Sequence, residues 1–173
     1  MLDATVGSPT ANSYVTTVEA DAYFDERLHA EAWTAASADD RARALIQATR
    51  RLDQEEYRGV PRNPLKGTSE NGPTQALKWP RRAAENDEGW VYEDDIIPTI
   101  VKHATMELAL AYLSADADPL ADTGLEGFAR VSIGSLEVEP RHARVAGELP
   151  ENVRRLLAPV LETSRATVRL VRA

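Results

Sequence analysis

The chain contains no cysteine among its 173 residues, which excludes disulfides, thiolate metal sites and cysteine nucleophiles. It also lacks any run approaching the roughly 20 apolar residues that a membrane-spanning helix needs. The first residues have neither a basic start nor a long apolar stretch, so we expect no secretory signal. These absences favour a protein that folds in the cytoplasm and does not bind a membrane.

Sequence patterns that mark catalytic or metal sites are also missing. The three histidines, His29, His103 and His142, lie far apart without the spacing of metal ligands. Residues 67–72 begin and end with glycine but lack the Lys-Ser/Thr ending of a phosphate-binding loop. A Gly-x-Ser-x-Gly nucleophile elbow is absent as well. We therefore expect a protein that is not an enzyme and that has neither a metal site nor a cofactor.

Acidic residues outnumber basic ones, 28 to 20, and the net charge is −8. The charge is unevenly distributed, because residues 141–173 contain seven arginines and three glutamates, a net charge of +4 that leaves −12 for residues 1–140. This polarity indicates an acidic body and a basic tail with different roles, although a chance distribution of helix-surface charge is an alternative. The acidic body argues against nucleic-acid binding by the whole surface.

Helical periodicity predicts three main helices. A capping box and apolar residues at helical spacing indicate the first, over about 17–31. Ser37, followed by acids in the first turn, indicates the start of a second helix over about 38–57. A wide apolar face indicates the third and strongest helix, over about 97–115, which we expect to be central.

Residues 58–95 are rich in helix breakers and predict a long loop. Such a loop is uncommon in a compact domain, and it carries Leu77 and several aromatic residues that should pack against the body. We expect an ordered loop that folds back on the helices. The anchor that we assign to it is Trp79-Pro80-Arg81: the tryptophan supplies apolar area, the proline restrains the backbone, and the arginine can hold a carboxylate or carbonyl.

The C-terminal quarter combines short elements. Residues 131–138 predict either two short strands around a tight turn or a single bent strand. A helix should begin at Pro150 and end or kink at Pro159, and residues 166–171 alternate as an edge strand does. The expected fold is mainly α: a small helical bundle with a long ordered loop, a short β element, and a C-terminal arm of one helix and one strand. We place the helical body at residues 1–127 and the β element and arm at residues 128–173.

Two features of the long loop leave alternatives open. The acids of residues 85–95 could perform acid–base chemistry or bind a divalent cation, but a solvated charged loop is the favoured interpretation. Three aromatic residues also lie close in sequence to two arginines: Trp79, Trp90, Tyr92, Arg81 and Arg82. Base stacking on single-stranded DNA would use such a set. Core packing of the aromatics is favoured, because the interleaved acids repel phosphates.

Segments spread over nearly the whole chain match a known order of motifs: ANSYVTTVEADAYFDER (11–27), ALIQATRRLD (44–53), QALKWPR (75–81), IIPTIVKHATMELAL (96–110), IGSLEVE (133–139), LPENVRRLLAPVL (149–161) and VRLVR (168–172). Together they resemble the head–tail connector (adaptor) proteins of tailed bacteriophages, some of which are described as DnaT-like single-strand binding proteins. The chain departs from that pattern in the insertion-like residues 61–74 and in the acidic run that follows Arg81.

This resemblance implies a structural virion protein rather than an enzyme. Connector proteins form a ring, usually of twelve copies, beneath the portal protein and above the stopper or tail-terminator protein. The ring extends the channel through which double-stranded DNA passes. The expected location is therefore the neck of the virion, after assembly in the host cytoplasm. The alternative function is that of a DnaT-like single-stranded DNA-binding replication protein, and the acidic body with its basic tail favours the connector.

The basic end of the chain is the element that we expect to dock on the portal. Its charge suits an acidic partner, and its alternation suits the addition of a strand to an exposed sheet edge. The alternative is an edge strand that pairs with residues 131–138 of the same subunit. The residues assigned to docking are Arg165, Val168, Arg169, Leu170 and Arg172.

Overall fold

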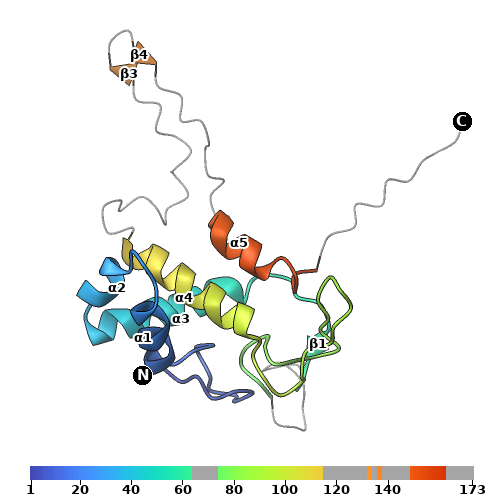
Figure 1. Cartoon of the computed structure of the whole chain (residues 1–173). Coiled ribbons are helices and arrows are strands. Elements are labelled where there is room, and N and C mark those ends of the chain that lie inside the picture. Colours follow the sequence, from blue (N-terminus) through green and yellow to red (C-terminus); the bar gives the residue numbers. More distant parts are fainter. Residues whose placement is uncertain (64–73, 115–131, 134–135, 138–148, 163–173) are drawn as a thin grey trace, which may run out of the picture.

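The computed structural model describes residues 1–63, 74–114, 132–133, 136–137 and 149–162. Within these residues the chain forms five helices and two small antiparallel sheets of two strands each, as Figure 1 shows. The expectation of a mainly α fold is confirmed. No helix of the described residues is long and apolar enough to cross a membrane.

The first predicted helix ends earlier than expected, and a second, short helix follows it. Helix α1 (Thr17–Asp25) begins with the expected capping box, and α2 (Glu31–Ala35) is a short helix that the periodicity did not indicate. The prediction of one helix over 17–31 is therefore wrong at its C-terminal end. The chain turns between them, where His29 has a left-handed backbone with φ of 60°. This turn places Trp33 of α2 in the core.

Helix α3 (Ala38–Leu52) begins at the predicted residue, where the Ser37 hydroxyl accepts a hydrogen bond from a backbone N–H of the first turn. It ends five residues before the predicted position 57. The reason is tertiary, because the chain turns inward and buries Tyr57, whose hydroxyl donates to the Leu52 carbonyl at 2.9 Å.

Helix α4 (Thr99–Ser114) matches the predicted third helix and is central, since α2, α3 and α5 all pack against it (Figure 1). Helix α5 (Glu151–Leu157) begins after Pro150 and ends before Pro159, as predicted. Its packing on α4 brings the C-terminal quarter of the chain onto the helical body.

Two short strand pairs complete the described fold. Strands β1 (Val60–Pro61) and β2 (Arg81–Arg82) pair antiparallel and close the long loop. Strands β3 (Ser132–Ile133) and β4 (Leu136–Glu137) also pair antiparallel, which decides between the two alternatives in favour of two strands. The predicted edge strand at 166–171 and the proposed boundary near residue 127 lie outside the described residues.

Candidate functional site: the aromatic loop and an exposed hairpin

Trp79 lies in the core rather than on the surface. Its side chain is 1% exposed, and its ring meets Tyr57 and Tyr92 edge-on, with centroids 5.6 and 6.4 Å away. The indole Nε1 is buried and has no hydrogen-bond partner among the described residues. Trp79 therefore contributes apolar contact area, and its ring face is not available to a nucleotide base.

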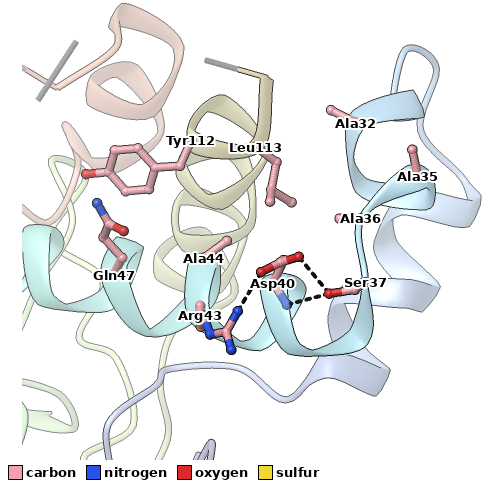
Figure 2. Close-up of a pocket in the computed structure, with 10 residues that line it drawn as sticks. All are labelled: Ala32, Ala35, Ala36, Ser37, Asp40, Arg43, Ala44, Gln47, Tyr112 and Leu113. Carbon is pink, nitrogen blue, oxygen red and sulfur yellow. Dashed lines mark hydrogen bonds and ion pairs between the residues drawn. The ribbon is translucent and has the colours of Figure 1, made fainter. Parts of the chain in front are cut away.

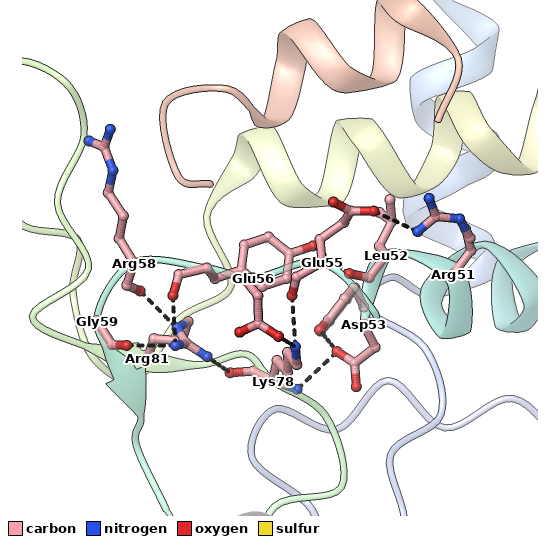
Figure 3. Close-up of polar contacts among 11 residues, drawn as sticks. Arg51, Leu52, Asp53, Glu55, Glu56, Arg58, Gly59, Lys78 and Arg81 are labelled. Carbon is pink, nitrogen blue, oxygen red and sulfur yellow. Dashed lines mark hydrogen bonds and ion pairs between the residues drawn. The ribbon is translucent and has the colours of Figure 1, made fainter. Parts of the chain in front are cut away.

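Arg81 is buried beside Trp79 and uses its guanidinium to hold the loop backbone. It donates to the carbonyls of Tyr57 (2.9 Å), Arg58 (2.8 Å) and Gly59 (2.6 Å), and to that of Lys78 at 3.3 Å (Figure 3). Burial lowers the pKa of the guanidinium, which nevertheless remains protonated. Because its donors face backbone carbonyls, this arginine has none arranged to bind a phosphate.

The same junction contains a second polar group that joins the loop to α3. The Asp53 carboxylate accepts a hydrogen bond from the Tyr14 hydroxyl and another from the Lys78 backbone N–H at 2.9 Å. The Lys78 ammonium in turn donates to the Glu55 carbonyl at 2.8 Å and pairs with the Glu56 carboxylate at 3.2 Å. Burial raises the pKa of Asp53. These contacts hold the loop on the helical body, and Figure 3 shows those that Lys78 makes.

A buried ion pair that sequence reasoning missed joins three helices. The Glu107 carboxylate of α4 is 7% exposed and accepts from Arg27 Nε at 2.6 Å and Nη2 at 2.8 Å, from the Tyr23 hydroxyl at 2.7 Å, and from Asn152 Nδ2 of α5 at 3.3 Å. The signal in the sequence is a lone glutamate inside the apolar run of residues 104–110. All of its partners are side chains of this fold, so the arrangement indicates a structural group.

Alkaline pH is expected to destabilise the protein through its tyrosines. Burial, and then the neighbouring Glu107, raise the pKa of Tyr23 to about 12 from an ordinary 10.0, and burial also raises the pKa values of Tyr14 and Tyr57. The neutral phenols favour the folded state, so this stability is complete below pH 10 and is lost as the pH rises toward 12. Urea midpoints should fall between about pH 9 and about pH 11, and Tyr23→Phe should show a smaller fall. Equal urea midpoints at both pH values would contradict the conclusion that burial raises the pKa values of these tyrosines in the folded state.

Residues 84–92 form a tight hairpin in the acidic part of the loop. The Tyr92 N–H donates to the Ala84 carbonyl at 2.8 Å, and the Asn86 N–H donates to the Trp90 carbonyl at 2.9 Å. The Asn86 side chain accepts from the backbone N–H groups of Glu88 (3.0 Å) and Trp90 (2.9 Å). This hydrogen-bonded turn holds Trp90 with its side chain 73% exposed.

Acidic side chains surround the hairpin and point to solvent. Asp87 pairs with Arg58 at 2.6 Å, and Asp94 lies 3.8 Å from Arg82. The other four acids of this region have no basic side chain within 4.0 Å among the described residues: Glu85, Glu88, Glu93 and Asp95. No group of acids or histidines in the described part of the chain is arranged to hold a metal ion.

The aromatic and basic residues that could together bind single-stranded DNA therefore lie in different environments and do not form one surface. Trp79 and Arg81 are buried, Tyr92 is half-buried against Trp79, and Trp90 is exposed among acids. Arg82 is exposed and lies near Asp94. The loop therefore presents one aromatic ring on an acidic surface, rather than the basic groove with several rings that single-strand binding proteins use.

A shallow groove of about 680 Å³ lies at the other side of the helical body. Its walls come from α2, α3 and the end of α4, as Figure 2 shows. Three of its polar side chains contact one another: Asp40 accepts from the Ser37 hydroxyl at 2.6 Å and pairs with Arg43 at 2.8 Å. The groove holds no unpartnered buried group and indicates no ligand chemistry.

The residues assigned to portal docking, Arg165 to Arg172, lie outside the described residues, and their role stays a prediction.

Comparison with known proteins finds one family. The family model described as "Putative DnaT-like ssDNA binding protein" matches residues 1–173. No curated protein and no solved structure matches the chain.

Proposed function

The chain belongs to the family of putative DnaT-like ssDNA-binding proteins, and from that premise we propose that it is a structural virion protein, a head–tail connector that assembles as a ring. The observation that carries this proposal is that Trp79 and Arg81 are buried within the subunit, where Arg81 donates hydrogen bonds to backbone carbonyls of the same chain. The resemblance of the sequence motifs to phage connectors supports it. In this proposal the Trp79-Pro80-Arg81 motif shapes the subunit and does not bind a ligand.

The proposed assembly follows the connector resemblance. About twelve copies would form a ring beneath the portal protein and contact the stopper or tail-terminator protein in the neck of the virion. Double-stranded DNA would pass through the ring without being held. The acidic body suits that task, because basic phosphate contacts bind DNA regardless of sequence and would retard its passage. No catalytic step and no cofactor enters the proposal.

The family's description favours a second function, binding of single-stranded DNA in replication. One structural observation supports it: Trp90 is exposed, and an exposed ring can stack on a base. The acids of the hairpin oppose it, since they repel the phosphates that would accompany such a base. Most of the binding energy for a single strand would have to come from the basic residues 141–173.

Electron microscopy of the recombinant protein, and of the virions that contain it, tests the connector proposal. The expected result is a closed ring, which is coaxial with the portal in the virion. A protein that stays monomeric at high concentration and is absent from virions would overturn the proposal.

Single-stranded DNA is expected to bind weakly at physiological salt. Fluorescence anisotropy of a labelled oligonucleotide at about 150 mM salt should show no sub-micromolar affinity, because the exposed tryptophan lies among acids. Trp90→Ala is the matched variant, and it should leave any residual binding unchanged. A sub-micromolar affinity would instead favour the replication function, and its loss in Trp90→Ala would place Trp90 in the binding site.

A further inference from the structure

The hairpin of residues 84–92 has the properties of a docking surface. Trp90 and Val91 are adjacent large apolar side chains, 73% and 61% exposed. They lie on a turn that its own hydrogen bonds hold in shape. A rigid exposed tryptophan is the residue type most often found at the energetic centre of protein interfaces, because it loses little conformational freedom on binding.

The charge around this pair selects the chemistry of its partner. Four exposed acids of residues 85–95 have no basic side chain within 4.0 Å in the described parts of the chain. A partner that covers Trp90 must bring its own positive charge to these carboxylates, or pay the cost of desolvating them. A segment in which apolar residues are interleaved with arginines has both properties: its apolar side chains can cover Trp90 and Val91, and its arginines can pair with the four exposed acids.

The described chain ends beside the hairpin. The Glu162 N–H donates to the Glu56 carbonyl at 2.8 Å, which holds the last described residue against the body. The Arg58 guanidinium then joins the two regions directly: it donates to the Leu161 carbonyl at 3.2 Å and to the Asp87 carboxylate at 2.6 Å. The point at which residues 163–173 follow the described chain is therefore separated from the hairpin only by the Arg58 side chain.

We propose that the hairpin is the docking surface for residues 163–173 of the same chain. This segment contains three arginines and no acid, and its three large apolar residues, Val168, Leu170 and Val171, lie between or beside the last two arginines. Its eleven residues can span at most about 36 Å when extended, which exceeds the distance bridged by the Arg58 side chain. Apolar residues of the segment cover Trp90 and Val91, and its arginines meet the free carboxylates.

This inference goes beyond the proposed ring and does not depend on it, because both surfaces belong to one chain. It also gives the basic tail a role in the isolated protein. The same segment on a second copy has identical chemistry, so the experiment must separate contact within one chain from contact between copies.

The absence of native cysteine makes disulfide trapping a direct test. The chain with Val91→Cys and Val168→Cys carries one cysteine on the hairpin and one on the segment. The control has Val18→Cys and Val168→Cys, since Val18 on α1 is similarly exposed, at 75%. The hairpin pair should form a disulfide within one chain at least about tenfold faster than the control pair. Each single-cysteine variant, titrated with a small disulfide reagent, corrects for differences in thiol reactivity.

Charge provides the second arm of the test. In the variant with Val91→Cys and Val168→Cys, changing Arg165, Arg169 and Arg172 to Glu should lower the rate of disulfide formation to that of the control pair. About 1 M salt should also lower this rate, without any further substitution. Equal rates for the two pairs, or a rate that neither charge reversal nor salt changes, would overturn the proposal. Disulfides found only between copies, identified by mixing isotope-labelled and unlabelled protein, would also overturn it and assign the hairpin to a neighbouring subunit.

Discussion

Replacing Trp79 with alanine is expected to lower the free energy of unfolding by about 3–5 kcal/mol. The side chain is 1% exposed and packs between Tyr57 and Tyr92. Its removal leaves a large cavity where the long loop meets the body, because Arg81 and Lys78 fix the backbone on either side and limit collapse. Urea unfolding followed by circular dichroism measures the loss.

Trp90→Ala is the matched control, since it removes the same side chain from the same loop at a 73% exposed position. In the chain with Arg165, Arg169 and Arg172 changed to Glu, where the proposed docking of residues 163–173 on Trp90 is removed, its effect should stay within about 0.5 kcal/mol. Trp79→Phe should cost less than Trp79→Ala, because it keeps an aromatic ring and removes a buried N–H that has no partner in the described residues. Similar small losses for Trp79→Ala and Trp90→Ala would show that Trp79 is not the anchor of the loop.

Glu107→Ala is the second large expected effect, a loss of about 3 kcal/mol. The carboxylate is buried on α4 and receives both Arg27 donors and the Tyr23 hydroxyl. Its removal leaves the guanidinium near the interior without a countercharge, although the 30% exposure of Arg27 lets water relieve part of the cost. The loss should persist at high salt, because buried pairs are little screened.

A paired substitution separates the ion pair from simple packing. Arg27→Met combined with Glu107→Leu removes both charges and keeps apolar volume, so it should recover most of the stability that Glu107→Ala loses. Arg43→Ala is the surface control: its ion pair with Asp40 is exposed, and the change should cost no more than about 1 kcal/mol. If Glu107→Ala costs as little as Arg43→Ala, the buried pair contributes nothing beyond a surface contact.

Helix positions were largely predictable because their signals are local. Ser37 begins α3, Pro150 begins α5, and the apolar residues of 97–115 mark α4 close to its observed limits. Capping groups and proline act within one turn of the chain, so they can be recognised without knowledge of the rest of the fold. The errors came at helix ends decided elsewhere, at the turn around His29 and at the inward path to Tyr57.

The aromatic loop shows where local signals stop. Trp79 and Trp90 are eleven residues apart in one proline- and glycine-rich stretch. The residues around each tryptophan do not predict which of the two is buried. The structure buries Trp79 because β2 pairs with β1 and Arg81 binds the carbonyls of residues 57–59. The favoured interpretation, core packing of these aromatics, is correct for Trp79 and wrong for Trp90, which is exposed.

The sequence by itself determined the mainly helical class, the start of each long helix, and the acidic body with its basic end, since all of these follow from composition and from spacing along one stretch of chain. Only the tertiary structure decided which polar groups meet. It joined Arg27 to Glu107 across 80 positions and set Arg58 between Leu161 and Asp87. Such pairs depend on how distant segments pack, because a side chain reaches only a few ångströms and periodicity carries no information on the partner's position.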